Sequence, residues 1–191
     1  WRLTLLVVVA VIASSQLAVA LANWLATLLV SPNALPRMDF STGIPASSSA
    51  LVVIPTIISS IGNIDELVES LEVRFLANRD ANLRFGLLTD FRDAPAESMP
   101  EDGPLLAHAT SRIDALNAFY RSDAFFLFHR PRRWNPGERA WMGFERKRGK
   151  LADLNWLLRE ADPANASERF SLVVGDTKRL AGTRYVITLD T

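Results

Sequence analysis

The sequence predicts an α/β domain with a mostly parallel sheet and flanking helices, preceded by a transmembrane α-helix. Two observations predict this architecture. From Leu3 to Val30 the chain carries no charged residue. After residue 50, short apolar runs alternate with stretches in which apolar residues recur at helical spacing, which is typical of βαβ units. The helix of each unit returns the chain to the starting end of the sheet, so the strands lie parallel, and these crossover connections are right-handed.

The composition excludes several kinds of site. The 191 residues hold 21 Lys and Arg against 21 Asp and Glu, so no overall field favours nucleic acid, and any anion site must be a local cluster. The absence of cysteine excludes disulfides, thiolate metal sites and a cysteine nucleophile, and it suits a cytoplasmic domain. The sequence also lacks a Gly-rich phosphate loop, a Ser-His-Asp spacing and a Cys/His metal cluster.

The uncharged run Leu3 to Val30 is interpreted as a membrane span. As one helix, at ~1.5 Å per residue, it exceeds the ~30 Å hydrocarbon core. Its polar residues, Ser14, Gln16 and Asn23 among them, are expected to face partner helices or to mark a break near Ser14. A signal peptide and a buried soluble helix are the alternatives. The run is long for a signal peptide, and only Arg2 precedes it.

Three segments follow from these patterns: a transmembrane segment at 1–30, a linker at 31–49 and a globular part at 50–191. The linker is rich in Pro, Gly and Ser, which form neither helix nor strand interiors. The chain starts with Trp1 rather than Met and stops at Thr191, inside an apolar strand pattern. We therefore interpret it as a fragment of a larger domain.

The globular part is expected to alternate strands and helices. Strands are predicted at 51–54, 83–89, 125–128 and 185–189, with a possible short strand at 170–174. Helices are predicted at 64–78, with capping residues at 60–63, at 105–119, and from about Arg148 onward. The segments 91–103 and 129–143 are predicted to be loops, and 161–178 is poorly patterned.

Ligands of open parallel sheets bind beyond the carboxyl ends of the strands. Four polar residues are predicted to lie there: Thr56, Asp90, His129 and Asp190. A basic cluster at 146–150 precedes an amphipathic helix, and N–H groups at the start of that helix, together with Arg148 and Lys150, would hold a diphosphate. A solvated basic turn ahead of a surface helix is the alternative interpretation of this cluster.

The order of these motifs resembles the N-terminal half of a GT-A glycosyltransferase domain, which is Rossmann-like. The motifs are Val-Val-Ile-Pro-Thr at 52–56, Leu-Leu-Thr-Asp-Phe at 87–91, Arg-Lys-Arg-Gly-Lys-Leu-Ala-Asp-Leu-Asn at 146–155 and Val-Ile-Thr-Leu-Asp at 186–190. More narrowly, segments 72–80, 129–136 and 141–155 resemble the membrane-embedded cyclic β-1,2-glucan synthases. This resemblance covers nearly the whole chain, including the hydrophobic segment and the linker.

The resemblance implies a membrane-bound glycosyltransferase that uses UDP-glucose, with inversion at the anomeric carbon, to extend a growing β-glucan chain. It implies a multi-pass parent protein of the bacterial inner (cytoplasmic) membrane, with further transmembrane helices and domains, a cytoplasmic transferase domain and no nucleic-acid partner. The alternative is a membrane-tethered binding module that holds nucleic acid or anionic lipid through its basic patches, with Trp134 and Trp141 interleaved.

The resemblance also implies roles for individual residues. The nucleotide-sugar-binding residues would be Thr56, Asp90, Arg148, Lys150 and Asn155. Asp90 would read the uracil edge, Arg148 and Lys150 would neutralise the diphosphate, and Asn155 would order the helix or the sugar. The family often has an acid where Ile57 and Ile58 stand here, so ribose contacts are expected elsewhere.

Asp190 is expected to bind Mg²⁺ or Mn²⁺ from the end of a buried strand, as the first acid of an Asp-x-Asp motif. The second acid and the catalytic base would lie outside this chain, so no catalytic residue is assigned and the fragment alone is expected to be inactive. Arg132, Arg133 and Trp134 are either substrate contacts or part of a loop packed on the sheet. His129 is expected to be a structural hydrogen bonder rather than a catalyst.

Overall fold

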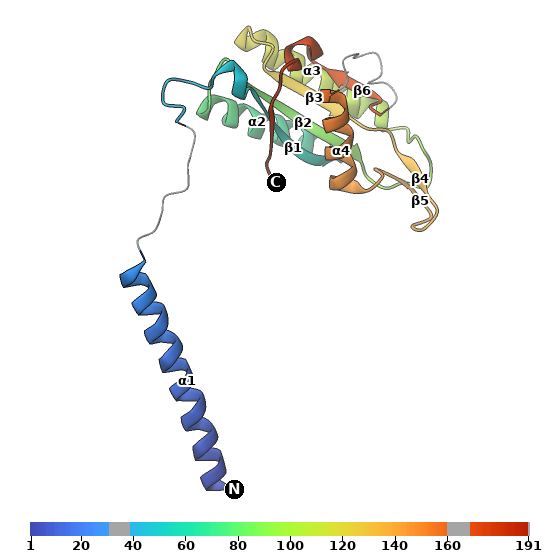
Figure 1. The fold of residues 1–191 in the computed structure, drawn as a ribbon. Helices are drawn as coiled ribbons and strands as arrows, with labels where there is room; N and C mark the ends of the chain where they lie inside the picture. Colours follow the sequence, from blue (N-terminus) through green and yellow to red (C-terminus); the bar gives the residue numbers. More distant parts are fainter. Residues whose placement is uncertain (31–38, 160–168, 191) are drawn as a thin grey trace. The chain divides into compact units, whose positions relative to one another are not determined.

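The structure is a computed structural model that describes residues 1–30, 39–159 and 169–190. Residues 31–38 of the predicted linker, residues 160–168 of the poorly patterned segment, and Thr191 lie outside the described residues. The chain divides into two compact units, Trp1–Asp39 and Phe40–Thr191 (Figure 1).

The first unit contains one unbroken helix, α1 (Arg2–Leu29). The hydroxyl of Ser14 donates to the carbonyl of Ala10 at 2.7 Å, so this polar group is satisfied within the helix and no break occurs there. The helix is long and apolar enough to cross a membrane, and its residues are all exposed in the structure. The predicted apolar helix is therefore confirmed as a single element.

The second unit is built on a five-stranded sheet with the order β6-β3-β2-β1-β7. Its strands are β1 (Ala50–Ile58), β2 (Leu83–Phe91), β3 (Phe125–His129), β6 (Leu172–Val174) and β7 (Tyr185–Thr188). All neighbours pair in parallel except β6, which runs antiparallel to β3. The mostly parallel sheet is therefore confirmed. The strand order reverses between β1 and β7, and such a switch point is where Rossmann-like sheets bind ligands.

Helices cover both faces of the sheet (Figure 1). One face carries α2 (Ile61–Ala77) and α3 (Asp102–Tyr120), and the other carries α4 (Arg146–Arg159). Because strand side chains alternate between faces, Val52 and Ile54 of β1 pack toward α2 and α3, whereas Leu51 and Val53 pack toward α4. Each fully buried Leu, Ile or Val of this kind stabilises the fold by about 1.5–3 kcal/mol.

Helix α2 shows why local sequence predicts this layer well. The side chain of Ser60 caps the helix by accepting the N–H of Asn63 at 3.2 Å. The buried residues of α2 recur at spacings of three and four and match the predicted stripe: Ile64, Leu67, Val68, Leu71 and Phe75. The predicted helix is therefore confirmed, with its start three residues earlier.

Two expectations about the elements are wrong. Segment 129–143 is not all loop, because β4 (Arg133–Asn135) and β5 (Ala140–Met142) form an antiparallel hairpin. Strand β7 is mostly exposed and lies at one edge of the described sheet, whereas a buried strand was predicted. The helix predicted from about Arg148 is confirmed as α4, with its start at Arg146. Short 3-10 helices lie at Ala46–Ser48 and Thr177–Leu180.

Candidate functional site

A pocket of about 390 Å³ lies at the carboxyl ends of β1 and β2, beside the first turn of α4. Three cationic and two acidic side chains line it, together with the ends of the two strands and Gly143. The lining residues are Pro55, Thr56, Ile57, Asp90, Phe91, Asp93, Gly143, Arg146, Lys147 and Lys150. The positive end of the α4 dipole therefore borders a pocket at the predicted edge of the sheet.

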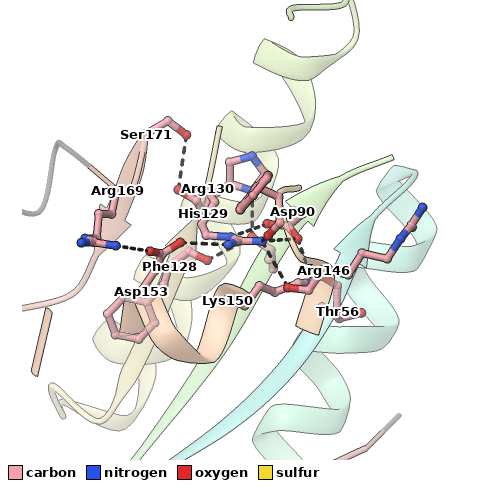
Figure 2. Close-up of polar contacts among 12 residues, drawn as sticks. Thr56, Asp90, Phe128, His129, Arg130, Arg146, Lys150, Asp153, Arg169 and Ser171 are labelled. Atoms are coloured by element: carbon pink, nitrogen blue, oxygen red, sulfur yellow. Dashed lines mark hydrogen bonds and ion pairs between the residues drawn. The ribbon is translucent and has the colours of Figure 1, made fainter. Parts of the chain in front are cut away.

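A buried ion pair between Asp90 and Arg130 supports the floor of this pocket (Figure 2). Arg130 donates from Nε to Oδ1 of Asp90 at 2.9 Å and from its second terminal nitrogen to Oδ2 at 3.0 Å. Both residues are 3% exposed. A bidentate guanidinium–carboxylate pair is rigid in both distance and direction, so the Asp90 side chain is held in one orientation.

The same guanidinium ties the end of β2 to the start of α4. Arg130 donates to Asp153 of α4 at 2.8 Å and to the carbonyl oxygens of Phe144 and Arg146 at 3.1 and 3.3 Å. Burial alone would lower the pKa of Arg130, but hydrogen bonds and charges from Asp90 and Asp153 raise it above its usual value. The five donors of one side chain thus organise the entry to α4.

Lys150 projects from the first turns of α4 into the same cluster (Figure 2). Its ammonium group donates to the carbonyl oxygen of Thr56 and lies 3.3 Å from Oδ2 of Asp90. Only 4% of the residue is exposed. Burial lowers the pKa of Lys150, and the charge of Asp90 opposes that shift. Lys150 therefore places a cation beside a pocket-lining carboxylate at the end of β1.

Two glycines allow the backbone to approach this cluster closely. A Cβ at Gly143 would lie 2.2 Å from Oδ2 of Asp90, and a Cβ at Gly149 would lie 2.2 Å from the carbonyl oxygen of Phe144. Between them, Glu145 and Arg146 adopt left-handed φ angles of 53° and 46°. Each such non-glycine residue costs on the order of 1–3 kcal/mol, so the surrounding contacts must impose this turn.

The exposed cations of the basic cluster are paired with acids. Arg146 contacts Asp93 at 2.9 Å, and Lys147 contacts Asp190; both cations line the pocket. Arg148 is not a lining residue, and its guanidinium bonds to Glu145, with Nε 3.2 Å from Oε2. Successive residues of the helix start therefore point in different directions, two toward the pocket and one away from it.

Comparison with known proteins identifies the relatives of this chain. No protein-family model matches it. It is 41% identical over 180 residues to the cyclic beta-(1,2)-glucan synthase NdvB of Rhizobium meliloti (strain 1021). The chain is homologous to a segment of a cyclic β-(1,2)-glucan synthase. The aligned region covers 93% of this chain but only 6% of that protein, so the chain spans a small part of the relative's length.

The predicted nucleotide-sugar-binding residues of this chain divide into two groups. Thr56, Asp90 and Lys150 come together in the pocket. Arg148 and Asn155 are exposed on α4 and are not lining residues of the pocket. Three of the five predicted contacts thus share one site in the structure.

Asp190 follows β7 and reaches the pocket only through its ion pair with Lys147. Its side chain is 84% exposed. Within the described residues no group of three or more His, Cys, Asp or Glu side chains could hold a metal ion. Mg²⁺ commonly takes one or two protein carboxylates and completes its shell with water and phosphate oxygens. Asp190 alone is therefore less than a complete site for a divalent cation.

Arg132, whose role the sequence left open, and His129 make structural contacts. The guanidinium of Arg132 is buried, bonds to Asp102 at 3.0 Å and to the carbonyl of Arg92 at 2.7 Å, and stacks on the ring of Phe91. It fastens the loop after β2 to the segment after β3. His129 is also buried, with Nδ1 2.8 Å from the hydroxyl of Thr89, as expected of a structural hydrogen bonder.

Sequence reasoning assigned no role to Arg130, which holds the pocket-lining carboxylate of Asp90. Its acidic partners, Asp90 and Asp153, are 40 and 23 positions away in the sequence. A signal was present, because an Arg placed directly after a buried strand requires a buried anion if it turns inward.

Proposed function

We propose that this chain is the donor-binding part of a membrane-bound glycosyltransferase that uses UDP-glucose to synthesise cyclic β-1,2-glucan. The homology to a named cyclic β-(1,2)-glucan synthase supports the reaction class. The apolar helix α1 supports attachment to a bilayer, with the catalytic unit on the cytoplasmic side of the bacterial inner membrane. A growing β-glucan chain is the acceptor, and other parts of the parent protein complete the enzyme.

The observation that carries the proposal is the pocket at the carboxyl ends of β1 and β2. Asp90 and Lys150 lie on its wall beside the ends of β1 and β2, and Arg146 and Lys147 border it at the first turn of α4. A uracil imide offers an N–H donor, and a fixed carboxylate such as Asp90 accepts one. Cations and the positive end of a helix dipole favour a bound diphosphate, and the start of α4 supplies both.

Transfer requires a hydroxyl of the acceptor to attack the anomeric carbon of glucose while the bond to the diphosphate oxygen breaks. Negative charge then grows on the departing UDP. Lys150, Lys147 and Arg146 are placed to stabilise this charge, because fixed cations in a preorganised site need little rearrangement during the reaction. Arg130 contributes indirectly by holding Asp90.

A divalent cation, Mg²⁺ or Mn²⁺, is part of this proposal. When bound, it would neutralise the diphosphate and assist departure of UDP. Asp190 would supply one carboxylate, and the diphosphate itself would supply further oxygens. Lys147, which holds Asp190 in the structure, would then turn from that carboxylate toward the phosphate groups.

The pairing of the cations favours this proposal over nucleic-acid or anionic-lipid binding. Arg146, Lys147 and Arg148 each contact a carboxylate, and Arg132 is buried against Asp102. Nucleic-acid sites instead present unpaired Lys and Arg along a phosphate backbone. The ion pairs leave a small charged pocket, which matches a nucleotide sugar better than a polymer.

Equilibrium titration of the intact protein in detergent with UDP-glucose and ADP-glucose tests the proposal. We expect UDP-glucose to bind more tightly, because the imide N–H that faces Asp90 is absent from adenine. Replacing Lys147 with Ala should weaken UDP-glucose binding about tenfold, as for loss of one charge-assisted contact. Lys150→Met should weaken it by at least as much.

Arg148→Ala provides the matched control, since Arg148 lies on the same helical turn but does not line the pocket. We expect this variant to bind UDP-glucose like the wild type. If Arg148→Ala lost as much affinity for UDP-glucose as Lys147→Ala, that result would support the sequence-based prediction that Arg148 binds the diphosphate. Equal affinity of the wild type for UDP-glucose and ADP-glucose would contradict the proposal that Asp90 binds uracil.

A further inference from the structure

The hairpin β4–β5 presents two tryptophans side by side. Trp134 and Trp141 are directly opposite each other in the antiparallel register, and their ring centroids are 6.0 Å apart at an interplanar angle of 58°. Directly opposed residues of two antiparallel strands project from the same face. The two rings therefore form one angled aromatic surface.

The hairpin has one face toward the protein and one face toward solvent. Met142 and Asn135 alternate with the tryptophans along the strands, so they project from the other face. Met142 is 3% exposed, and the amide of Asn135 donates to its sulfur. Trp134, by contrast, is 47% exposed. The hairpin thus packs through its methionine side and leaves a large aromatic ring in solvent.

This aromatic face is fixed to the rim of the candidate donor pocket. The backbone of Trp141 exchanges two hydrogen bonds with Ala94, at 2.9 and 3.0 Å. Asp93, the neighbour of Ala94, lines the pocket, and so does Gly143, two residues after Trp141. The hairpin projects from one end of the second unit (Figure 1). An acceptor that lies on the tryptophans would therefore be next to the donor.

We propose that Trp134 and Trp141 form an acceptor subsite that binds glucose units of the growing β-glucan, an inference that rests on the proposed function. The axial C–H groups of β-linked glucose form an apolar face that packs on an aromatic ring, while the hydroxyl groups at the sugar edge remain available to polar partners. Large rings with little conformational entropy to lose are efficient anchors for such contacts. The exposed residues Gly137 to Arg139 belong to the turn that joins β4 to β5.

Binding of a linear β-1,2-linked glucose oligosaccharide to the intact protein, without donor, tests this subsite. Calorimetric titration should show the affinity for the oligosaccharide falling about tenfold in Trp134→Ala, as expected when an aromatic anchor is truncated. Trp134→Phe, which keeps a flat aromatic face, should lose no more than about threefold. The affinity for UDP-glucose should stay unchanged in both variants and reports that the fold is intact.

Phe119 is the matched control, because it is a large aromatic residue that is 76% exposed on α3, outside the hairpin. Phe119→Ala should leave the affinity for the oligosaccharide unchanged. Wild-type affinity for the oligosaccharide in Trp134→Ala would overturn the subsite. Tryptophan-dependent, salt-sensitive binding of a single-stranded RNA in place of the oligosaccharide would also overturn it, in favour of a nucleic-acid surface.

The outcomes for the two proposals are separable. If UDP-glucose binds and the affinity for the oligosaccharide does not depend on Trp134, the acceptor subsite is wrong and the donor site is supported. If UDP-glucose does not bind but the affinity for the oligosaccharide still depends on Trp134, the donor site fails and the hairpin stands as a carbohydrate-binding surface.

Discussion

Arg130 is the residue that most connects the fold to the candidate site. It neutralises two buried carboxylates, Asp90 and Asp153, which come from different layers of the domain. Removal of one partner from such a network leaves buried charges without compensation, which costs more than the network contributes when intact. The contacts of Arg130 therefore matter both to stability and to the direction in which Asp90 points.

We predict that Arg130→Met destabilises the protein by about 3–5 kcal/mol, because Asp90 and Asp153 would remain buried without their main partner. Urea denaturation of the protein in detergent, followed by near-UV circular dichroism, measures this change. Arg146→Met is the control, since Arg146 has a 60% exposed side chain and an exposed ion pair. If Arg130→Met lowered the free energy of unfolding as little as Arg146→Met, the buried ion pair would not contribute measurably to stability.

His129 gives a prediction about pH. Burial lowers its pKa from 6.5 to about 3, with Arg132, Lys150 and Arg130 adding to the shift and Asp102 opposing it. The unfolded chain therefore binds a proton between about pH 6.5 and pH 3 that the folded protein does not bind. The stability that depends on neutral His129 is complete above about pH 6.5 and decreases as the pH falls toward 3.

Between pH 6.5 and pH 5 we expect the free energy of unfolding to fall by about 1.6 kcal/mol on account of His129, because the slope rises from about 0.7 kcal/mol per pH unit, where the unfolded histidine is half protonated, toward about 1.4 kcal/mol per pH unit. Most carboxylates are still ionised in this window, so they add little. Urea titrations at the two pH values measure the loss, and His129→Asn should show much less of it. An identical pH dependence in His129→Asn would show that the histidine is already protonated in the fold.

At the scale of elements, helix α4 is placed by contacts that its own sequence does not reveal. It begins at Arg146, the second of two consecutive left-handed residues, and Gly149 lies against the carbonyl of Phe144. Arg130 then holds the helix from the end of β3. The direction of α4, and with it the position of Lys150, depends on these close approaches.

We predict that Gly149→Ala destabilises the protein by about 1–3 kcal/mol, because its Cβ would overlap backbone that cannot move freely. Gly62→Ala is a well-matched control, since Gly62 is also helical and a Cβ there would have no atom within 4 Å. That substitution should stabilise the protein slightly, by about 0.4–1 kcal/mol. Thermal unfolding of both variants tests the difference, and equal melting temperatures would contradict the proposed packing.

The sequence predicted those elements whose signals are local. Apolar runs and helical stripes located β1, β2, β3, β7 and the three helices of the second unit, because the spacing of the buried apolar residues can be seen in the sequence of each element. The hairpin β4–β5 was missed because each strand has only three residues, too few to show alternation. Its signal is the turn sequence Asn135 to Gly137 between two tryptophans.

The candidate site was predicted only in part, for the same reason. The carboxyl ends of parallel strands follow from topology, so Thr56 and Asp90 could be brought together from the sequence, and Lys150 was added from the basic cluster at the start of a predicted helix. Side-chain direction on α4 could not, and this is why Arg148 was expected where Arg146 and Lys147 lie. The ion pair of Arg130 joins residues far apart in the sequence, so no local pattern contains it.

At the scale of the whole molecule, the second unit includes the segment before β1. The N–H of Ile44 donates to Asp80 at 2.8 Å, and the side chain of Asn82 donates to the carbonyl of Ile44 at 2.7 Å. Part of the predicted linker is therefore fastened to the domain. A variant that lacks residues 1–38 retains these contacts, whereas one that starts at Ser47 loses them.

We predict that the variant lacking residues 1–38 partitions into the aqueous phase, while the intact chain requires detergent because α1 exposes a continuous apolar surface. Detergent phase separation measures this difference. The variant that starts at Ser47 should also be soluble but less stable, by about 1–2 kcal/mol for the two lost hydrogen bonds. Equal partition of the intact chain and the truncated variant into water would contradict a membrane role for α1.

Photo-crosslinking with 5-azido-UDP-glucose, followed by peptide mapping of the intact protein, tests most directly where the donor binds. Labelled residues are expected within 55–57, 90–93 and 143–150, the segments that line the pocket at the ends of β1, β2 and the start of α4. Excess UDP should protect these segments, and ADP should protect them less. Labelling confined to the opposite end of the sheet, around Arg84, Arg121 and Arg179, would contradict a donor site at the carboxyl ends of β1 and β2.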